Sequence, residues 1–299
     1  MKNYISIDTG GTFIKHGVIR EDGEILRRGK IPTPQTSPEA YFSAIRDICC
    51  TYADFHPEQV LSMSLPGTVD EKTGMIRGQS SIPFIHTIPF RELAEKASGM
   101  KVRMENDANC AALGETWLGC AKDTESAAFL IFGTGLGGAL CLNGKLLRGF
   151  HMAAGEFSDY ISFYDRNPLR LRNADAILST RKTVKHIAEL SRIPEEDLNG
   201  EIIFRRAEEQ IEPYADAAAG ICYETAVLVF NIQHIFDPEV VVLGGGMSGQ
   251  VLWYSQTLHC LEEIYNRTES FAPVRLLRST MGNDANLLGA LRHTLIDRE

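Results

Sequence analysis

The first 30 residues alternate between apolar and polar positions, which is typical of strands with one buried face. Ile5 and Ile7 alternate with polar residues, and the apolar run 13–19 follows the glycine-containing segment 8–12. Asp22-Gly23 comes after that run, and Asp-Gly between apolar runs is a strong hairpin signal. The pattern predicts a strand, a glycine turn, a second strand, a tight turn and a third strand.

A helical spacing of apolar residues follows. Tyr41, Ile45, Ile48 and Tyr52 recur at intervals of three and four residues, which predicts a helix over 38–55. Apolar runs and amphipathic runs then alternate along the chain. We expect strands over 60–65 and 102–104, and helices over 90–98 and 108–118.

The opening pattern recurs in the second half of the chain. The apolar run 127–132 predicts a buried strand and leads into the glycine-rich segment 133–138. Residues 139–142, the turn Asn143-Gly144 and residues 145–147 complete the pattern. Because turn residues occupy matching places in both halves, we interpret this as an internal duplication. Two such glycine turns that face each other across a cleft would bind a nucleotide.

Beyond Pro168 the pattern becomes mainly helical. Helices are expected over 215–236, 251–265 and 285–295, and a buried strand over 240–243. No apolar run approaches the roughly 20 residues that a membrane span needs. The first residues form a strand and a glycine turn rather than a signal peptide. We therefore expect a cytoplasmic protein.

Composition narrows the function classes. The 299 residues allow two domains of ordinary size, and 44% apolar with 23% charged residues are typical of a globular protein. The 30 basic and 39 acidic residues give a net charge of -9, whereas duplex binding needs a basic face, so nucleic acid is not an expected partner. The seven cysteines show neither CxxC nor metal-ligand spacing, and an odd number of cysteines in a chain of this length argues against a disulfide scaffold.

The first glycine turn is a candidate phosphate site. It reads Asp8-Thr-Gly-Gly-Thr12, with Lys15 inside the strand that follows, so it is not a Walker A loop. The N–H groups of Gly10 and Gly11 can form an anion-binding nest, with the Thr12 hydroxyl as a further donor. Asp8, at the strand end, could hold Mg²⁺ through water. A plain hairpin turn is the alternative interpretation.

Two further glycine segments follow apolar strands. Residues 133–138 read Gly-Thr-Gly-Leu-Gly-Gly, for which a flexible loop or a tight connection is the alternative. Residues 244–246 are three glycines that would let a ligand approach the backbone, although a helix-entry turn is commoner. Because all three glycine segments come directly after apolar strands, together they favour nucleotide binding.

Acidic residues beside a predicted helix supply a candidate base. Glu105-Asn-Asp-Ala-Asn109 lies between a short strand and an apolar helix, so Asn106 or Asp107 could simply cap that helix. Alternatively, a carboxylate here orients an alcohol for attack on a γ-phosphate and accepts its proton. Segment 155–159 adds two more acids, for which a solvated loop is the simpler interpretation.

These motifs resemble the ROK family (repressors, open reading frames, kinases) of bacterial sugar kinases and sugar-sensing repressors. The matching segments occur in family order across nearly the whole chain: 8–15, 64–70, 105–109, 133–138, 155–157 and 243–246. The resemblance implies an α/β, two-lobed actin-like ATPase (ribonuclease H-like) fold with a central nucleotide and sugar cleft. It implies lobes at 1–118 and 119–286, with the C-terminal helix 287–299 packing back on the first lobe, and commonly a homodimer.

The resemblance also implies roles for individual residues. Asp107 becomes the catalytic base on a sugar hydroxyl, usually the one at C6, and Gly67, Asn106, Asp107 and Glu156 become sugar contacts. Mg²⁺ would accompany the nucleotide, held by Asp8 through water. The residues implied in ATP binding are Asp8, Gly10, Gly11, Thr12, Lys15, Gly133, Thr134, Gly135, Gly137, Gly244, Gly245 and Gly246.

The sequence departs from the family pattern at its zinc motif. Asp159 stands where many members have a histidine, and segment 167–183 lacks the family's cysteine cluster, so no structural zinc is expected. Asp175 is a candidate for the family's second sugar-binding glutamate. Ser80 or Ser81 stands where many members have an asparagine.

Among family members, the chain most resembles the β-glucoside kinases. The resemblance rests on the zinc-free pattern, on the stretch 81–86 that ends in His86, and on Gly155-Glu-Phe157. The missing histidine would lie at the anomeric end of the sugar, so a rearranged site there could admit a substituent on O1. Glucokinase and N-acetylmannosamine kinase are the alternatives.

Three functions other than sugar phosphorylation are less favoured. A ROK repressor carries a helix-turn-helix domain ahead of the first glycine motif, whereas seven residues precede Asp8 and the charge is acidic. A non-catalytic sugar-binding protein would need neither Asp107 nor two glycine turns. An actin-like structural ATPase would not need a sugar site.

Overall fold

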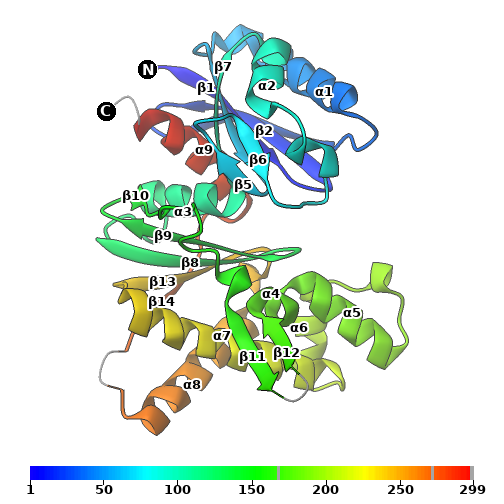
Figure 1. Cartoon of the computed structure of the whole chain (residues 1–299), viewed down its shortest axis with the longest axis vertical. Coiled ribbons are helices and arrows are strands. Elements are labelled where there is room, and N and C mark those ends of the chain that lie inside the picture. Colours follow the sequence, from blue (N-terminus) through cyan, green and yellow to red (C-terminus); the bar gives the residue numbers. More distant parts are fainter. Residues whose placement is uncertain (167–168, 271–272, 297–299) are drawn as a thin grey trace. The chain divides into compact units, whose positions relative to one another are not determined.

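The chain forms two units, each built around a five-stranded sheet (Figure 1). The structure, a computed structural model, describes residues 1–166, 169–270 and 273–296. Unit 1 comprises Met1–Gly119 and Asp284–Glu299, and unit 2 comprises Cys120–Asn283. The last three residues of the helix expected over 287–299 lie outside the described residues.

The sheet of unit 1 has the strand order β3-β2-β1-β4-β7. Its first three strands form an antiparallel meander, and β4 and β7 run parallel to β1. A short antiparallel ribbon, β5–β6, follows β4. The elements are β1 (Asn3–Thr9), β2 (Phe13–Arg20), β3 (Ile25–Pro32), α1 (Pro38–Thr51), β4 (Val60–Leu65), β5 (Thr68–Asp70), β6 (Met75–Arg77), α2 (Phe90–Ser98), β7 (Lys101–Asn106), α3 (Asp107–Leu118) and α9 (Ala285–Ile296).

The two faces of this sheet carry different kinds of side chain. Ile5, Ile7, Leu61 and Met63 pack with α1 and α2 in one hydrophobic core. The opposite face of β1 and β4 includes Ser6, Asp8, Ser62 and Ser64, which are polar yet buried, and α9 contacts β1, β4 and β7. Ser62 Oγ lies 2.7 Å from Thr294 Oγ1 of α9, so a helix from the end of the chain closes this face with polar contacts.

The sheet of unit 2 repeats the arrangement, with the order β10-β9-β8-β13-β14. Helices α4 to α8 share one core with this sheet, in which Trp253 makes an edge contact with Phe132 at 4.6 Å between ring centroids. The elements are β8 (Ser126–Phe132), β9 (Leu136–Leu142), β10 (Lys145–Leu146), β11 (Ile161–Arg166), β12 (Leu169–Asn173), α4 (Ala174–Leu178), α5 (Thr180–Ser191), α6 (Gly200–Glu208), α7 (Tyr214–Phe236), β13 (Val240–Gly245), α8 (Val251–Thr268) and β14 (Arg275–Arg278).

The matching strand orders agree with the predicted duplication, because each sheet is a three-stranded meander extended by two parallel strands. Some details differ from expectation. The helix expected over 38–55 ends at Thr51 and is followed by a 3₁₀ turn at Ala53–Phe55. The ribbon β5–β6, the hairpin β11–β12 and strand β14 were not expected.

One expectation about apolar runs was wrong. Helix α7 has 23 residues and is long and apolar enough, by length and composition, to cross a membrane. Its apolar side chains have another explanation, since Ala218, Ile221, Cys222 and Val229 lie in the core of unit 2. The core helix of a globular unit has the same composition.

Candidate active site

Three parallel strands of unit 1 end side by side. In the register of the sheet, Asp8 of β1 lies beside Ser64 of β4, and Ser64 lies beside Glu105 of β7. Ligands of open α/β sheets bind beyond the carboxyl ends of their strands. The structure therefore gathers the expected residues of unit 1 at the edge where a ligand is expected.

Asp8 is held by residues from two distant parts of the chain. Its side chain is buried, and Oδ1 accepts hydrogen bonds from Ser64 Oγ at 2.7 Å and Asn286 Nδ2 at 3.0 Å. Lys15 Nζ lies 3.6 Å from Oδ2. A single carboxylate in this setting fits a magnesium ion that keeps most of its water, because Mg²⁺ is commonly held by one or two carboxylates together with phosphates.

The first glycine turn contacts the segment after β3 and the loop after β6. Thr33 Oγ1 donates to Gly10 O at 2.6 Å, and Gln35 Nε2 donates to Gly11 O at 2.6 Å. A Cβ on Gly11 would collide with the Ser81 side chain, so the close approach requires glycine. Because carbonyl oxygens repel anions, their engagement with Thr33 and Gln35 favours the anion-binding interpretation of this turn. The Gly10 N–H, which was expected to take part in the nest, instead donates to Phe13 O at 3.0 Å.

Segment 105–109 was considered for two roles, as the cap of the helix that follows and as the source of a catalytic base. Asn106 is the N-cap of α3, since its side chain accepts from Asn109 N at 3.0 Å. Its Nδ2 donates to Gly67 O at 3.1 Å and to Asp107 Oδ1 at 3.0 Å. Asn106 is therefore the N-cap, and half-buried Asp107 occupies the first helical position, where its Oδ1 also accepts from Ala108 N at 2.8 Å.

Gly67 adopts a backbone conformation that requires glycine. Its φ is +93°, and a Cβ would lie 2.8 Å from Arg77 O and 2.9 Å from His86 Cε1. His86 Nε2 lies 2.8 Å from Ser80 Oγ, and burial lowers the pKa of His86. The contacts join the turn at Gly67, the loop around Ser80 and the start of α3 in one cluster.

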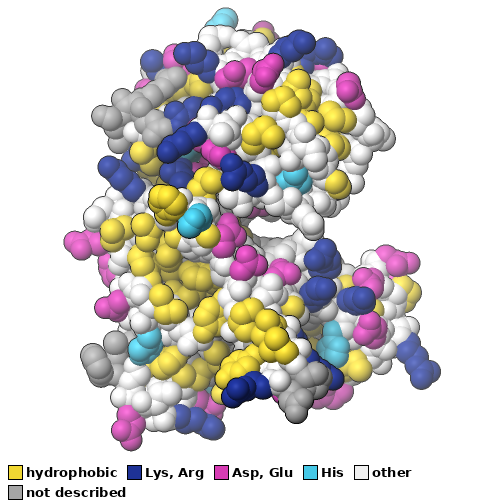
Figure 2. Space-filling view, viewed as in Figure 1, with side chains coloured by type: hydrophobic (Ala, Val, Ile, Leu, Met, Phe, Trp, Pro, Cys, Tyr) yellow, Lys and Arg dark blue, Asp and Glu magenta, His cyan; other side chains and the backbone are white. Residues whose placement is uncertain are grey.

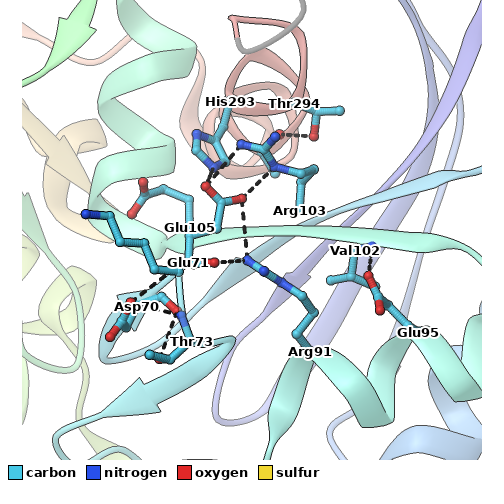
Figure 3. A network of polar contacts seen from close by, with 12 residues as sticks. Asp70, Glu71, Thr73, Arg91, Glu95, Val102, Arg103, Glu105, His293 and Thr294 are labelled. Atoms are coloured by element: carbon cyan, nitrogen blue, oxygen red, sulfur yellow. Dashed lines mark hydrogen bonds and ion pairs between the residues drawn. The ribbon is translucent and has the colours of Figure 1, made fainter.

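The ribbon that follows Gly67 is anchored through Glu71 (Figure 3). Glu71 lies 2.5 Å from Arg103 Nε of β7 and 3.2 Å from His293 Nε2 of α9, and its carbonyl accepts from Arg91 of α2. Burial alone would raise the pKa of Glu71, but the contacts with His293 and Arg103 outweigh it and lower the pKa to about 2. Glu71 therefore fixes the ribbon to three other elements.

In unit 2 the other two glycine segments lie beside each other. Gly244 and Gly245 of β13 pair with Ile131 and Phe132 at the end of β8, from which residues 133–135 lead into β9. Gly245 has φ +87°, and a Cβ there would collide with the backbone of Phe132. The structure thus brings Gly133, Thr134, Gly135 and Gly137 to the same sheet edge as residues 244–246.

Glu156 and Asp159 lie in a loop that packs on β9. A Cβ on Gly155 would lie 2.9 Å from Ala139 Cα, so the loop contacts the strand backbone. Burial, together with the neighbouring Asp159 carboxylate, raises the pKa of Glu156. Asp175, considered as a sugar contact, accepts from Leu136 N at 2.9 Å.

Sequence reasoning missed two residues of unit 1. Ser64 was noted only as part of a motif, although parallel strand ends would have placed it beside Asp8. Asn286 reaches Asp8 across 278 residues of sequence, and no local pattern signals that contact. An open hollow of unit 1 includes none of the expected site residues; it is lined by Lys2, Tyr4, Glu21, Asp22, Trp117, Arg292 and Leu295.

Within the described part of the chain, no group of three or more His, Cys, Asp or Glu side chains could hold a metal ion. Residues 167 and 168, at the start of the segment that lacks the cysteine cluster, lie outside that part. The expected absence of zinc therefore stays a prediction.

Two duplicated α/β units, each with a glycine turn between its first two strands, define an actin-like ATPase fold. The chain belongs to the ROK family, whose family model matches residues 4–295. This confirms the resemblance that the motifs indicated.

The relatives include sugar kinases that match nearly end to end. A β-glucoside kinase of Listeria monocytogenes is 30% identical over 97% of this chain and 96% of its own length. An N-acetyl-D-glucosamine kinase of Haemophilus influenzae is 30% identical over 96% of this chain and 97% of its own. A crystal structure of a ROK family protein from Streptococcus pneumoniae in complex with sucrose has a TM-score of 0.87 and 30% identity, covering 99% of both chains. The family match and these relatives support an ATP-dependent carbohydrate kinase.

Proposed function

We propose that this protein transfers the γ-phosphoryl group of ATP to a hydroxyl of a β-glucoside, with the C6 hydroxyl as the acceptor. The observation that carries the proposal is the position of Asp107, directly beyond a parallel strand end and beside the Asp8 and Ser64 strand ends. A helix start at a ligand-binding sheet edge is where an acceptor-binding carboxylate is useful.

In this proposal Asp107 is the catalytic base. Its carboxylate orients the sugar hydroxyl and accepts the hydroxyl proton while the oxygen attacks the γ-phosphorus and ADP leaves. Asn106, which bonds both Gly67 and Asp107, holds the acceptor-binding turn and the base in one arrangement. Gly67, Asn106 and Glu156 complete the proposed sugar contacts.

The nucleotide is proposed to bind the glycine segments of both units. Residues 8–12 with Lys15, and residues 133–137, would contact the phosphates, and residues 244–246 would lie near the adenosine. Mg²⁺, when held through water by Asp8, supplies positive charge against the phosphate oxygens. Most catalysis of phosphoryl transfer comes from such positioning and charge neutralisation.

Two observations support a glucoside with a substituted anomeric oxygen as the acceptor. The named relatives include a β-glucoside kinase at 30% identity over almost the whole chain. A second relative crystallised with sucrose, in which the glucose carries an α-linked substituent on O1; that complex supports a substituted O1 and not the β configuration. The N-acetyl-D-glucosamine kinase at the same identity favours a free amino sugar as the second candidate.

An ADP-release assay with ATP and Mg²⁺ tests the acceptor. The panel is glucose, cellobiose, an aryl β-glucoside, N-acetylmannosamine and N-acetylglucosamine, with the 6-deoxy form of the best glucoside as control. We expect the highest kcat/KM on cellobiose or the aryl glucoside and no turnover of the 6-deoxy form. Turnover of free hexoses or amino sugars alone would contradict the β-glucoside assignment.

The variant Asp107→Asn tests the base. We expect kcat to fall at least about 1,000-fold, because base and orienter are lost together, while sugar binding changes little. Asp47→Asn, at an exposed aspartate of α1, is the matched control and should leave kcat unchanged. Near-normal turnover of Asp107→Asn would show that another group accepts the proton.

We also propose that the protein works in the cytoplasm, where ATP and imported sugars are found, and that it is a homodimer, as the family resemblance implies. Sedimentation equilibrium of the purified chain tests the dimer directly. A single species with a mass near 33.2 kDa would contradict it.

A further inference from the structure

The second glycine turn is held by a carboxylate from a separate segment of unit 2. Asp175 Oδ1 accepts a hydrogen bond from Leu136 N at 2.9 Å, where β9 begins. The same oxygen would lie 3.1 Å from a Cβ on Gly135. A backbone amide of the proposed phosphate-binding turn is therefore already engaged by a side chain of this protein.

Backbone contacts from the next helix reinforce this tether. Thr180 N donates to Gly133 O at 3.3 Å, and Arg181 N donates to Thr134 O at 3.4 Å. Together with the Asp175 bond, they attach the turn to the beginning of α4 and α5. Thr134 and Gly135 themselves are exposed, so these tethers limit the conformations of a segment that packing does not fix.

Buried neighbours and a helix cap fix the position of Asp175 in unit 2. It follows Ala174, which is fully buried, and precedes Leu178, which is buried in the core of unit 2. Asn173 caps α4 by accepting from Ala176 N at 3.0 Å, so the Asp175 side chain is not needed as the cap. Its carboxylate is available for the glycine turn because another residue begins the helix.

We propose that Asp175 is a positioning residue that holds the second glycine turn in the conformation that binds the nucleotide phosphates. The proposal rests on the ATP-dependent kinase function proposed above. It assigns Asp175 to the nucleotide side of the reaction, in place of the sugar contact considered from the sequence. A carboxylate near phosphates repels them, so its contribution is to the geometry of the turn: a turn ordered in advance loses less entropy on binding.

Three variants separate geometry from charge and from helix capping. Asp175→Ala removes the acceptor, and Asp175→Asn keeps an acceptor oxygen while removing the charge. Asn173→Ala removes the α4 cap without touching the bond to Leu136. For each we would measure KM for ATP, KM for the sugar, the affinity for a non-hydrolysable ATP analogue, and amide hydrogen exchange at Leu136.

We expect Asp175→Ala to raise KM for ATP and weaken analogue binding about tenfold, which is the loss of one charge-assisted hydrogen bond. KM for the sugar should change less than about twofold, and exchange at Leu136 should accelerate. Asp175→Asn should restore ATP binding to within about threefold. Asn173→Ala should leave both KM values near those of the unmodified protein.

Other results would overturn the inference. If both Asp175 variants bind ATP more tightly, the carboxylate competes with phosphate rather than positioning the turn. If only KM for the sugar rises, Asp175 is a sugar contact. Absence of turnover by the unmodified protein would refute the proposed kinase function instead; analogue binding would then decide the role of Asp175, and a protein that does not bind the analogue would refute both.

Discussion

Replacing Gly289 by alanine should strongly destabilise unit 1, although glycine-to-alanine changes inside helices usually stabilise. Gly289 lies in α9, where a Cβ would be 1.6 Å from the carbonyl oxygen of Cys110 and 2.8 Å from its Cα, both in α3. Gly114 of α3 in turn lies against the backbone of Ala285 in α9. The two helices therefore approach each other through glycines on both sides, and their backbones leave no space for a methyl group.

The size of the effect follows from this geometry. A contact at 1.6 Å must open by roughly 1.5 Å to reach the distances that real Cβ atoms show, and the atom it meets is helix backbone rather than a flexible side chain. Opening the interface should cost about 3 to 5 kcal/mol, which exceeds the roughly 1 to 3 kcal/mol usual for overpacking because rigid helix backbone cannot move aside as a side chain can. The better helix propensity of alanine returns about 1 kcal/mol. We expect a net loss of about 2 to 4 kcal/mol.

Gly220→Ala provides the matched control. Gly220 lies in the interior of α7 and is exposed, and a Cβ there would meet nothing within 4 Å. Only propensity acts there, so the substitution should stabilise by about 0.5 to 1 kcal/mol. The same substitution is thus expected to change the free energy of unfolding in opposite directions at two helical positions.

Thermal unfolding followed by circular dichroism and calorimetry checks this. Gly289→Ala should lower the Tm of the first unfolding transition seen on heating by about 5 to 12 °C. Gly220→Ala should leave that Tm unchanged or raise it slightly. Because α9 carries Asn286 and α3 begins at Asp107, KM for ATP and kcat should also worsen for Gly289→Ala. A Tm for Gly289→Ala at or above that of the unmodified protein would refute the close helix packing.

The remaining predictions concern one ion-pair network and one glycine segment. Glu71→Gln should cost about 2 kcal/mol at pH 7, somewhat less than the shift of its pKa from 4.5 to about 2 would give, because the side chain is 27% exposed. A lowered pKa stabilises the fold above pH 4.5 and loses that effect as pH falls towards 2, so denaturant titrations should show the difference narrowing over this window. Glu92→Gln, at an exposed site of α2, should show neither effect. Gly245→Ala should raise KM for ATP about tenfold, because a Cβ there meets the Phe132 backbone. Gly249→Ala is the control and should leave KM unchanged, since a Cβ there has nothing within 4 Å. Equal KM values for the two variants would contradict the role of residues 244–246.

The sequence predicted those parts of the fold in which a pattern and its cause are local. Strand β4 and helix α2 have the predicted bounds, and the order strand, glycine turn, strand was visible in both halves. The buried polar face of the first sheet was not predictable in this way. Ser6, Asp8, Ser62 and Ser64 alternate with apolar residues as solvent-facing side chains would, but α9 covers them through contacts that span 232 and 278 residues of sequence.

In the hairpin β11–β12, by contrast, a strand pattern is present in the sequence but was not predicted as a strand. Its second strand reads Leu-Arg-Leu-Arg-Asn, a strict alternation that favours a half-buried strand, yet the chain beyond Pro168 was expected to be mainly helical. In the structure Tyr164, Leu169 and Leu171 are all exposed, and Figure 2 shows hydrophobic side chains over this part of unit 2. Five residues of alternation are too few to decide between strand and loop without the partner strand.

The candidate site shows what a duplicated framework leaves to individual residues. Both sheets place a glycine turn between their first two strands, and the sequence indicates this in each half. The side chains that tether the two turns are unrelated: those of Thr33 and Gln35 bind carbonyls of the first turn, whereas that of Asp175 binds an amide of the second. The carbonyls of the second turn are bound by backbone N–H groups at the start of α5. A phosphate-binding turn needs its backbone held in one conformation, and any nearby donor or acceptor can do this. The strand and turn pattern is therefore predictable from sequence, while the side chain that positions each turn is found only once the fold brings it there.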